Sequence, residues 1–155
     1  MGFNSKSFID TKYVPRTFKV PVPALKDFFD KADKPEFEVR GLTGVEIGQT
    51  NEAINGYDNK VAIVEALLSQ QKEEIVSAIK KFIGVSDDVA KDTALSFEQM
   101  ILACVNPKVD LQLVKKICKV SPGSFTLISN KIRYLSAQGY IPGKPKPSGK
   151  ITESK

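Results

Sequence analysis

The residue types that most often carry out reactions are few in this chain, and their spacing assembles no catalytic set. There is no His, so the commonest general base and the commonest metal ligand of proteins are both missing. Cys104 and Cys118 each lie in an apolar helical pattern, where a free Cys behaves as a small buried hydrophobe. We therefore expect no catalytic residue, no metal, no cofactor and a reducing, cytosolic compartment.

Two clusters resemble ligand sites only at first sight. The segment Gly41–Gly48 has three glycines ahead of a predicted helix, but their spacing matches neither the dinucleotide fingerprint nor the P-loop. Asp87, Asp88 and Asp92 lack the alternating oxygen ligands and the terminal Glu of a calcium loop. Turn geometry and helix-start charge explain the two clusters better.

The net charge of +5 is unevenly distributed along the 155 residues. Residues 1–40 carry eight basic and six acidic side chains, residues 41–139 carry eleven of each, and residues 140–155 carry four Lys against one Glu. The body of the protein therefore has no net field that would favour nucleic acid.

The C-terminal tail, residues 140–155, is rich in Pro, Gly and Lys. Such a segment cannot offset its ordering entropy by burial, so we expect it to be disordered. Lys144, Lys146 and Lys150 could contact phosphates, but Tyr140 is the only aromatic beside them, which argues against base stacking. A tail that contacts a partner protein or aids solubility is the better interpretation.

The N-terminal region is rich in aromatics. Residues 1–16 resemble a loosely ordered arm, and no apolar stretch there suggests a signal peptide. No stretch anywhere reaches the ~18 apolar residues of a membrane span. Six of the nine Phe lie in the first 37 residues. They either pack on the protein's own helices or leave some rings exposed for a partner chain.

A strand that feeds directly into a helix is predicted at Phe37–Glu46. Phe37–Arg40 alternates apolar and polar residues as a half-buried strand does. Thr43 and Glu46 have the capping-box spacing of a helix start. Thr17–Val22 also alternates but contains Pro, which suits an edge strand. The two strands predict an antiparallel hairpin over residues 17–42.

The rest of the pattern is helical. We expect helices over Thr43–Asn55 and Lys60–Ile83 with a turn at Gly56–Asn59, followed by runs over 95–105, 111–120 and 122–138. Expected helix-start and helix-end signals are Gly84, Ser86, Thr93 or Ser96, Asp110, and Ser121 with Pro122. The predicted fold class is mainly α (α+β), a single globular domain over 17–139 with a hairpin (17–42) and a helical body (43–139).

Four features follow one another along the chain. They are the Val-Pro-Val-Pro segment 20–23, the Phe37–Glu46 strand-to-helix segment, a helical body that closes with Ile128–Ser136, and the basic tail Gly143–Lys150. In this order they resemble the tail assembly chaperones of long-tailed bacteriophages and prophages, over about residues 18–150.

The resemblance implies a non-enzymatic helper in the bacterial host cytoplasm. Members of that family bind the long, helical tape measure protein, keep it soluble while tail tube subunits polymerise around it, and leave before the tail is finished. The resemblance also allows that the chain contacts the tail tube protein and that it forms a homo-oligomer. A chaperone for helices needs an apolar groove and no catalytic residues. The alternatives are a structural tail or baseplate subunit and a small nucleic-acid-binding module.

Two regions are predicted to bind the partner. One is the charged hairpin loop around Phe28 and Phe29, where the charged setting argues against deep burial of both of these adjacent large rings. The other lies near Tyr134 and Tyr140 at the end of the last helix, beside the tail lysines Lys144, Lys146 and Lys150. There, a captured helix would meet aromatic side chains first and Lys side chains next.

Overall fold

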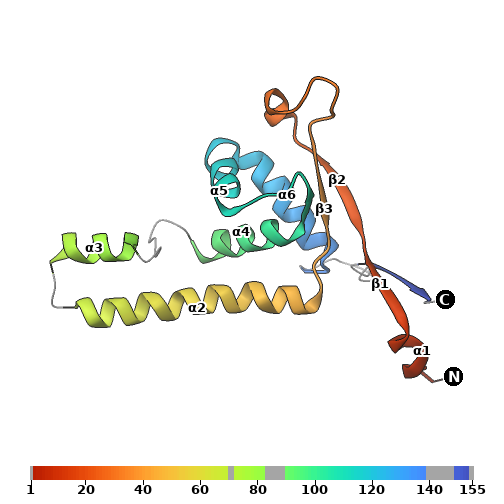
Figure 1. Cartoon of the computed structure of the whole chain (residues 1–155), viewed down its shortest axis with the longest axis horizontal. Helices are drawn as coiled ribbons and strands as arrows, with labels where there is room; N and C mark the ends of the chain where they lie inside the picture. Colours follow the sequence, from red (N-terminus) through yellow and green to blue (C-terminus); the bar gives the residue numbers. More distant parts are fainter. Residues whose placement is uncertain (1, 70–71, 83–89, 139–148, 154–155) are drawn as a thin grey trace.

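The computed structural model is mainly α with some β, as predicted (Figure 1), and it describes residues 2–69, 72–82, 90–138 and 149–153. In chain order its elements are α1 (Ser5–Ile9), β1 (Thr11–Pro15), β2 (Thr17–Pro21), the 3-10 helix η1 (Pro23–Phe28), β3 (Glu36–Arg40), α2 (Gly44–Leu68), α3 (Glu73–Phe82), α4 (Lys91–Ala103), β4 (Cys104–Asn106), α5 (Leu111–Val120), α6 (Pro122–Leu135) and β5 (Gly149–Glu153).

The predicted hairpin is confirmed. Strand β2 pairs antiparallel with β3, so that Val20 lies opposite Phe37 and Phe18 opposite Val39. Strand β4 adds to the other edge of β3, which gives the strand order β2-β3-β4. This third strand was missed, because Cys104 and Val105 continue the apolar pattern that predicted a helix over 95–105. The helix α4 ends at Ala103 instead.

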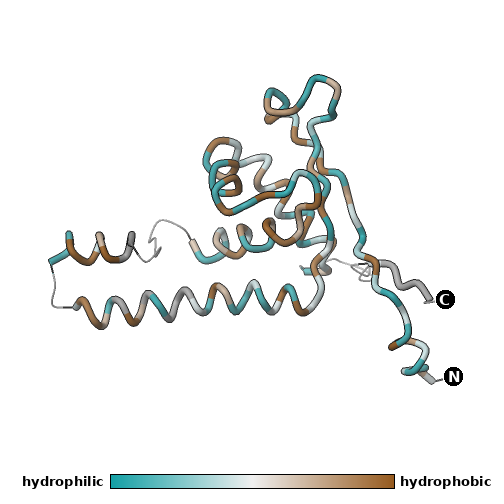
Figure 2. The backbone as a smooth tube through the Cα atoms, in the orientation of Figure 1, coloured by the Kyte–Doolittle hydropathy of each residue, from teal (hydrophilic) through white to brown (hydrophobic). Residues whose placement is uncertain are grey.

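The core lies between this sheet and the helices α4, α5 and α6, which gather on one side of it (Figures 1 and 2). Its fully buried side chains include Val39 on the sheet, Met100 on α4, Val114 on α5 and Ile128 on α6. Every second residue of β3 is buried, because successive side chains of a strand point to opposite faces.

An ion pair between Arg40 and Glu46 joins the end of β3 to the first turn of α2, and we call this junction the corner. The Glu46 carboxylate accepts hydrogen bonds from the Arg40 guanidinium (2.5 and 2.9 Å) and from the Thr43 N–H (2.9 Å). The Thr43 hydroxyl accepts from the Glu46 N–H at 3.2 Å, which completes the predicted capping box. Arg40 also donates to the Leu102 carbonyl at the end of α4 (3.1 Å). The Arg40 guanidinium lowers the pKa of Glu46 from 4.5 to about 2.

The predicted break at Gly56–Asn59 is wrong, because α2 runs without interruption to Leu68. A Gly inside a helix costs about 1 kcal/mol relative to Ala, which the helix tolerates. A Cβ built at Gly56 would meet no atom within 4 Å outside the helix's own nearby backbone, so no close contact there requires a Gly. The helix ends instead at Leu68, with Ser69 as its C-cap, and α3 runs back beside α2 (Figure 1).

The predicted helix starts have mixed outcomes. Asp110 caps α5 as expected, since its carboxylate accepts from the Leu113 N–H at 2.8 Å. Pro122 opens α6 as expected, but the Ser121 hydroxyl donates to the Ser124 hydroxyl instead of capping the backbone.

Helix α4 begins earlier than predicted. Its N-cap is Ala90, so Thr93 and Ser96 lie inside the helix and do not cap it. The Ser96 hydroxyl instead donates to the Asp92 carbonyl (2.9 Å), as Ser often does within a helix. The expected signals at Gly84 and Ser86 lie outside the described residues.

The expected loose arm and disordered tail contain regular structure. Residues 5–9 form α1, and β1 pairs antiparallel with β5 (Figure 1). The prediction of disorder is therefore wrong for residues 149–153, where backbone hydrogen bonds to β1 supply what side-chain burial could not. Residues 140–148 lie outside the described part of the chain.

Within the described ranges, no helix is both long enough and apolar enough to cross a bilayer.

The corner predicts a pH-dependent stability. Because the pKa of Glu46 is about 2 in the folded protein against 4.5 as its ordinary value, its contribution is complete above pH 4.5 and is lost as the pH falls to 2. Glu46→Gln keeps the capping geometry but removes the charge, so it should cost about 2 kcal/mol of unfolding free energy at pH 7 after allowance for solvent screening. Urea unfolding at pH 7 and pH 2 measures this, and a difference that persists at pH 2 would contradict the assignment.

Candidate functional site

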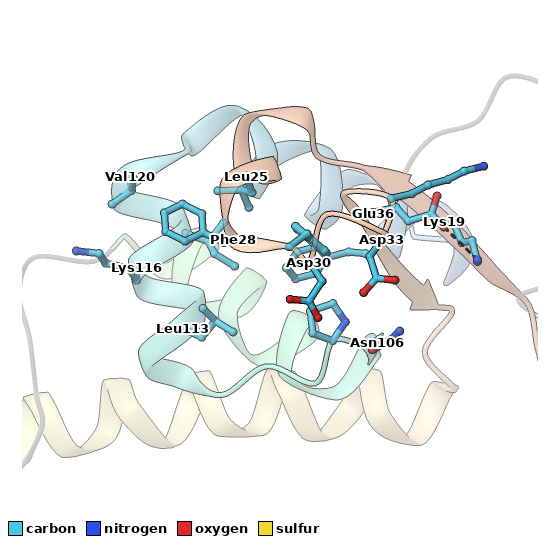
Figure 3. Close-up of a pocket in the computed structure, with 15 residues that line it drawn as sticks. Lys19, Leu25, Phe28, Asp30, Asp33, Glu36, Asn106, Leu113, Lys116 and Val120 are labelled. Carbon is cyan, nitrogen blue, oxygen red and sulfur yellow. Dashed lines mark ion pairs between the residues drawn. The ribbon is translucent and has the colours of Figure 1, made fainter.

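A groove of about 680 Å³ lies between the hairpin loop and helix α5 (Figure 3). Its base is made by core residues, including Leu25 and Phe37 from the hairpin and Ile117 from α5. Its rim carries apolar side chains that remain in water: Phe28 is 83% exposed and Val120 is 57% exposed. The groove is therefore continuous with the core at its base and unfilled at its mouth.

The rim is charged on both sides. Its acidic and basic side chains are Asp30, Asp33, Glu36, Lys19, Lys34 and Lys116. Lys19 and Glu36 neutralise each other at 3.0 Å, and the hydrogen bond to Glu36 raises the pKa of Lys19. In Figure 3, Lys116 lies on α5, across the groove from Asp30 and Asp33. A ligand of this groove thus meets apolar surface between carboxylates on the loop and an ammonium on α5.

Sequence elements explain how the apolar rim forms. Pro23 opens η1 and fixes its first turn, and the last residue of that short helix is Phe28. On α5, Leu113, Lys116 and Val120 are spaced three and four residues apart, so they lie on one face of the helix. Val114 and Ile117 are buried against the core, and Ile117 also reaches the groove base.

Phe28 and Phe29, predicted as one binding unit, have different environments. Phe29 is partly buried, packs against the core and meets the Phe37 ring edge-on with 6.2 Å between centroids. Phe28 has no such ring contact among the described residues. Both line the groove, but only Phe28 offers a largely free ring.

The second predicted region is elsewhere. Tyr134 does not line the groove; it lies in a cluster with Phe18, Lys131 and Arg16. Tyr140, Lys144 and Lys146 lie outside the described residues. Lys150 is placed by its backbone alone, opposite Val14 in the β1–β5 ribbon. Of the predicted residues whose side chains are described, Phe28 and Phe29 thus line the groove and Tyr134 lies apart from it.

Sequence reasoning missed the α5 half of the groove. Leu113 and Val120 are large apolar side chains at 39% and 57% exposure on a helix that already buries another face. The signal was present as apolar residues on more than one face of the 111–120 run. It could not be used without knowing that the hairpin loop faces this helix.

The two cysteines, both predicted to be buried, have different environments, because Cys118 is only half-buried against the core. Cys104 is fully buried, and burial raises the pKa of its thiol to about 12. It is therefore a neutral core residue, as predicted. Within the described segments, no group of three or more potential ligands lies close enough together to hold a metal ion.

Comparison of the chain with protein-family models, with curated proteins and with solved structures finds no match.

The contrast between the two loop aromatics is testable by single substitutions. Phe28→Ser should change the free energy of unfolding by less than about 0.5 kcal/mol, because the ring is already in water. Phe29→Ser should cost about 2 kcal/mol or more, because it removes a partly buried ring and its contact with Phe37. Urea unfolding followed by circular dichroism measures both, and equal costs would show that the two rings share one environment.

Proposed function

We propose that this protein is a non-enzymatic binding protein whose groove takes up an amphipathic helix of a partner. The observation that supports the proposal is the exposed Phe28 ring above an apolar groove of about 680 Å³. A pocket of this size receives several apolar side chains. Helix-in-groove recognition uses such anchors at three- and four-residue spacing on the partner helix.

The free energy of binding would come mainly from the apolar rim. Moving a fully exposed Phe side chain out of water contributes about 2 to 3 kcal/mol, and Phe28 is close to that limit in the free protein. Leu113 and Val120 add apolar area on the opposite wall. Asp30, Asp33 and Lys116 on the rim would accelerate and orient the encounter more than they would strengthen it.

The partner proposed from the family resemblance is a phage tape measure protein. Such a protein is long, helical and prone to aggregate, so a protein that covers its apolar helix faces would keep it soluble. In this proposal the chain acts as a tail assembly chaperone in the bacterial host cytoplasm and is absent from the finished particle. A structural tail subunit would instead be found in purified virions.

Co-expression tests this proposal. The chain is co-expressed with the longest coding sequence just downstream of its gene, and the soluble fraction of that product is measured together with pull-down. The wild-type chain should keep the product soluble. Phe28→Ser together with Leu113→Ser should reduce the co-purified product at least about tenfold, since two central anchors are lost.

Leu127→Ser is the matched control. Leu127 is an exposed apolar residue on α6 (56%) that does not line the groove, so this variant should capture the partner as the wild type does. If the groove variants keep full capture while remaining folded, the groove is not the binding site. If the wild type captures nothing, the helix-chaperone function is wrong.

A further inference from the structure

The Arg16 guanidinium, which lies between β1 and β2, has two buried nitrogens without a hydrogen-bond partner. Arg16 is half-buried, and its backbone carbonyl accepts from the Gly41 N–H at 3.1 Å. Its Nε and Nη2 atoms are buried and have no hydrogen-bond partner. These two nitrogens form one edge of the guanidinium, the edge that grips two oxygens of a carboxylate or phosphate side by side.

A second cation lies in the same cluster. The Lys131 ammonium is 3.5 Å from the centroid of the Phe18 ring and 5.1 Å from that of Tyr134. The Arg16 guanidinium carbon is 5.9 Å from the centroid of that same Tyr134 ring. Two like charges thus share one aromatic ring and repel each other, although each gains some attraction from the ring face.

No carboxylate of the described segments neutralises this pair. The carboxylates of Glu36 on β3 and Glu46 on α2 are already paired, with Lys19 and Arg40 respectively. A buried N–H left unpaired destabilises the fold, and more so when it belongs to a charged group. The cluster therefore carries uncompensated positive charge and two unpaired hydrogen-bond donors, which a negatively charged group with two acceptor oxygens would satisfy.

We infer that Arg16 and Lys131 form a binding site for an oxyanion, a carboxylate or a phosphate group. The Arg16 edge would donate two parallel hydrogen bonds, and Lys131 would supply the second charge. Phe18 and Tyr134 are 45% and 37% exposed and Lys131 is half-buried, so part of this cluster is open to water and to dissolved anions. Binding would move aside the groups that now cover that edge.

Arginine side-chain NMR tests the site on the full chain, which has only three Arg. The protein is titrated with sodium phosphate and separately with sodium acetate, at an ionic strength held constant with NaCl. The Arg16 Nε–H resonance should move downfield and saturate. A response to acetate alone identifies a carboxylate site, and a response to phosphate alone identifies a phosphate site. Lys131→Met should weaken the apparent affinity at least about fivefold.

Thermal unfolding gives an independent measurement. The midpoint of the wild type should rise by about 2 °C or more in the binding anion relative to NaCl. Arg16→Met should abolish that rise, and in NaCl alone it should be at least as stable as the wild type. Arg133→Met is the control, because Arg133 donates to the Ser96 hydroxyl at 2.9 Å and lies outside the cation pair. It should lose stability but keep the anion-dependent rise.

Three outcomes would overturn the inference. The Arg16 resonance responds to neither salt, Arg16→Met keeps the anion-dependent rise, or Arg16→Met loses several degrees in NaCl alone. The last outcome would show that the fold itself satisfies the guanidinium. None of these readouts depends on the groove at Phe28, so the site and the proposed function can fail separately.

Discussion

Arg40 joins four parts of the chain at one point. It is the last residue of β3, its guanidinium holds Glu46 in the first turn of α2, and it also donates to the carbonyls of Gly41 and Leu102. A partly buried ion pair contributes net stability only when its remaining donors and acceptors are satisfied, and here both the carboxylate and the guanidinium have further partners. Ser136 at the end of α6 adds to the same corner by accepting from the Leu42 N–H at 2.8 Å.

This corner determines where the groove can form. It fixes the direction of β3 relative to α4 and α6, and β3 in turn carries the hairpin whose loop faces α5 (Figures 1 and 3). One wall of the groove is thus a packed helix, while the other is a short 3-10 turn anchored by Leu25. Among the described side chains of helix α2, the buried ones, Thr50 and Ile54, lie in its first half. The described lining of the groove includes no residue of α2 or α3.

Local signals predicted the fold where the determining contacts are local. The capping box at Thr43 and the cap at Asp110 involve residues three apart, and both form as expected. The hairpin followed from alternation on two nearby strands. Strands β4 and β5 pair with strands far away in the sequence, so no local pattern could predict them. The turn predicted at Gly56 does not form, because the free-energy cost of a Gly inside a helix is small compared with the hydrogen bonds of a continuous helix.

The aromatic residues of the N-terminal region show why residue type alone could not assign the site. The Phe37 ring is buried in the core, Phe29 leans against it, and Phe18 receives the Lys131 ammonium on its face. Unlike these three rings, Phe28 is left mostly in water, at the end of η1.

The position of Phe28 follows from the chain that carries it. The strand alternation that buries Phe37 does not extend into η1, where no packed neighbour encloses the last residue. The hairpin therefore places one exposed ring, Phe28, beside helix α5, whose Leu113 and Val120 side chains are also partly exposed. That pairing, which only the tertiary fold creates, is the physical basis of the proposal that a partner binds at the groove.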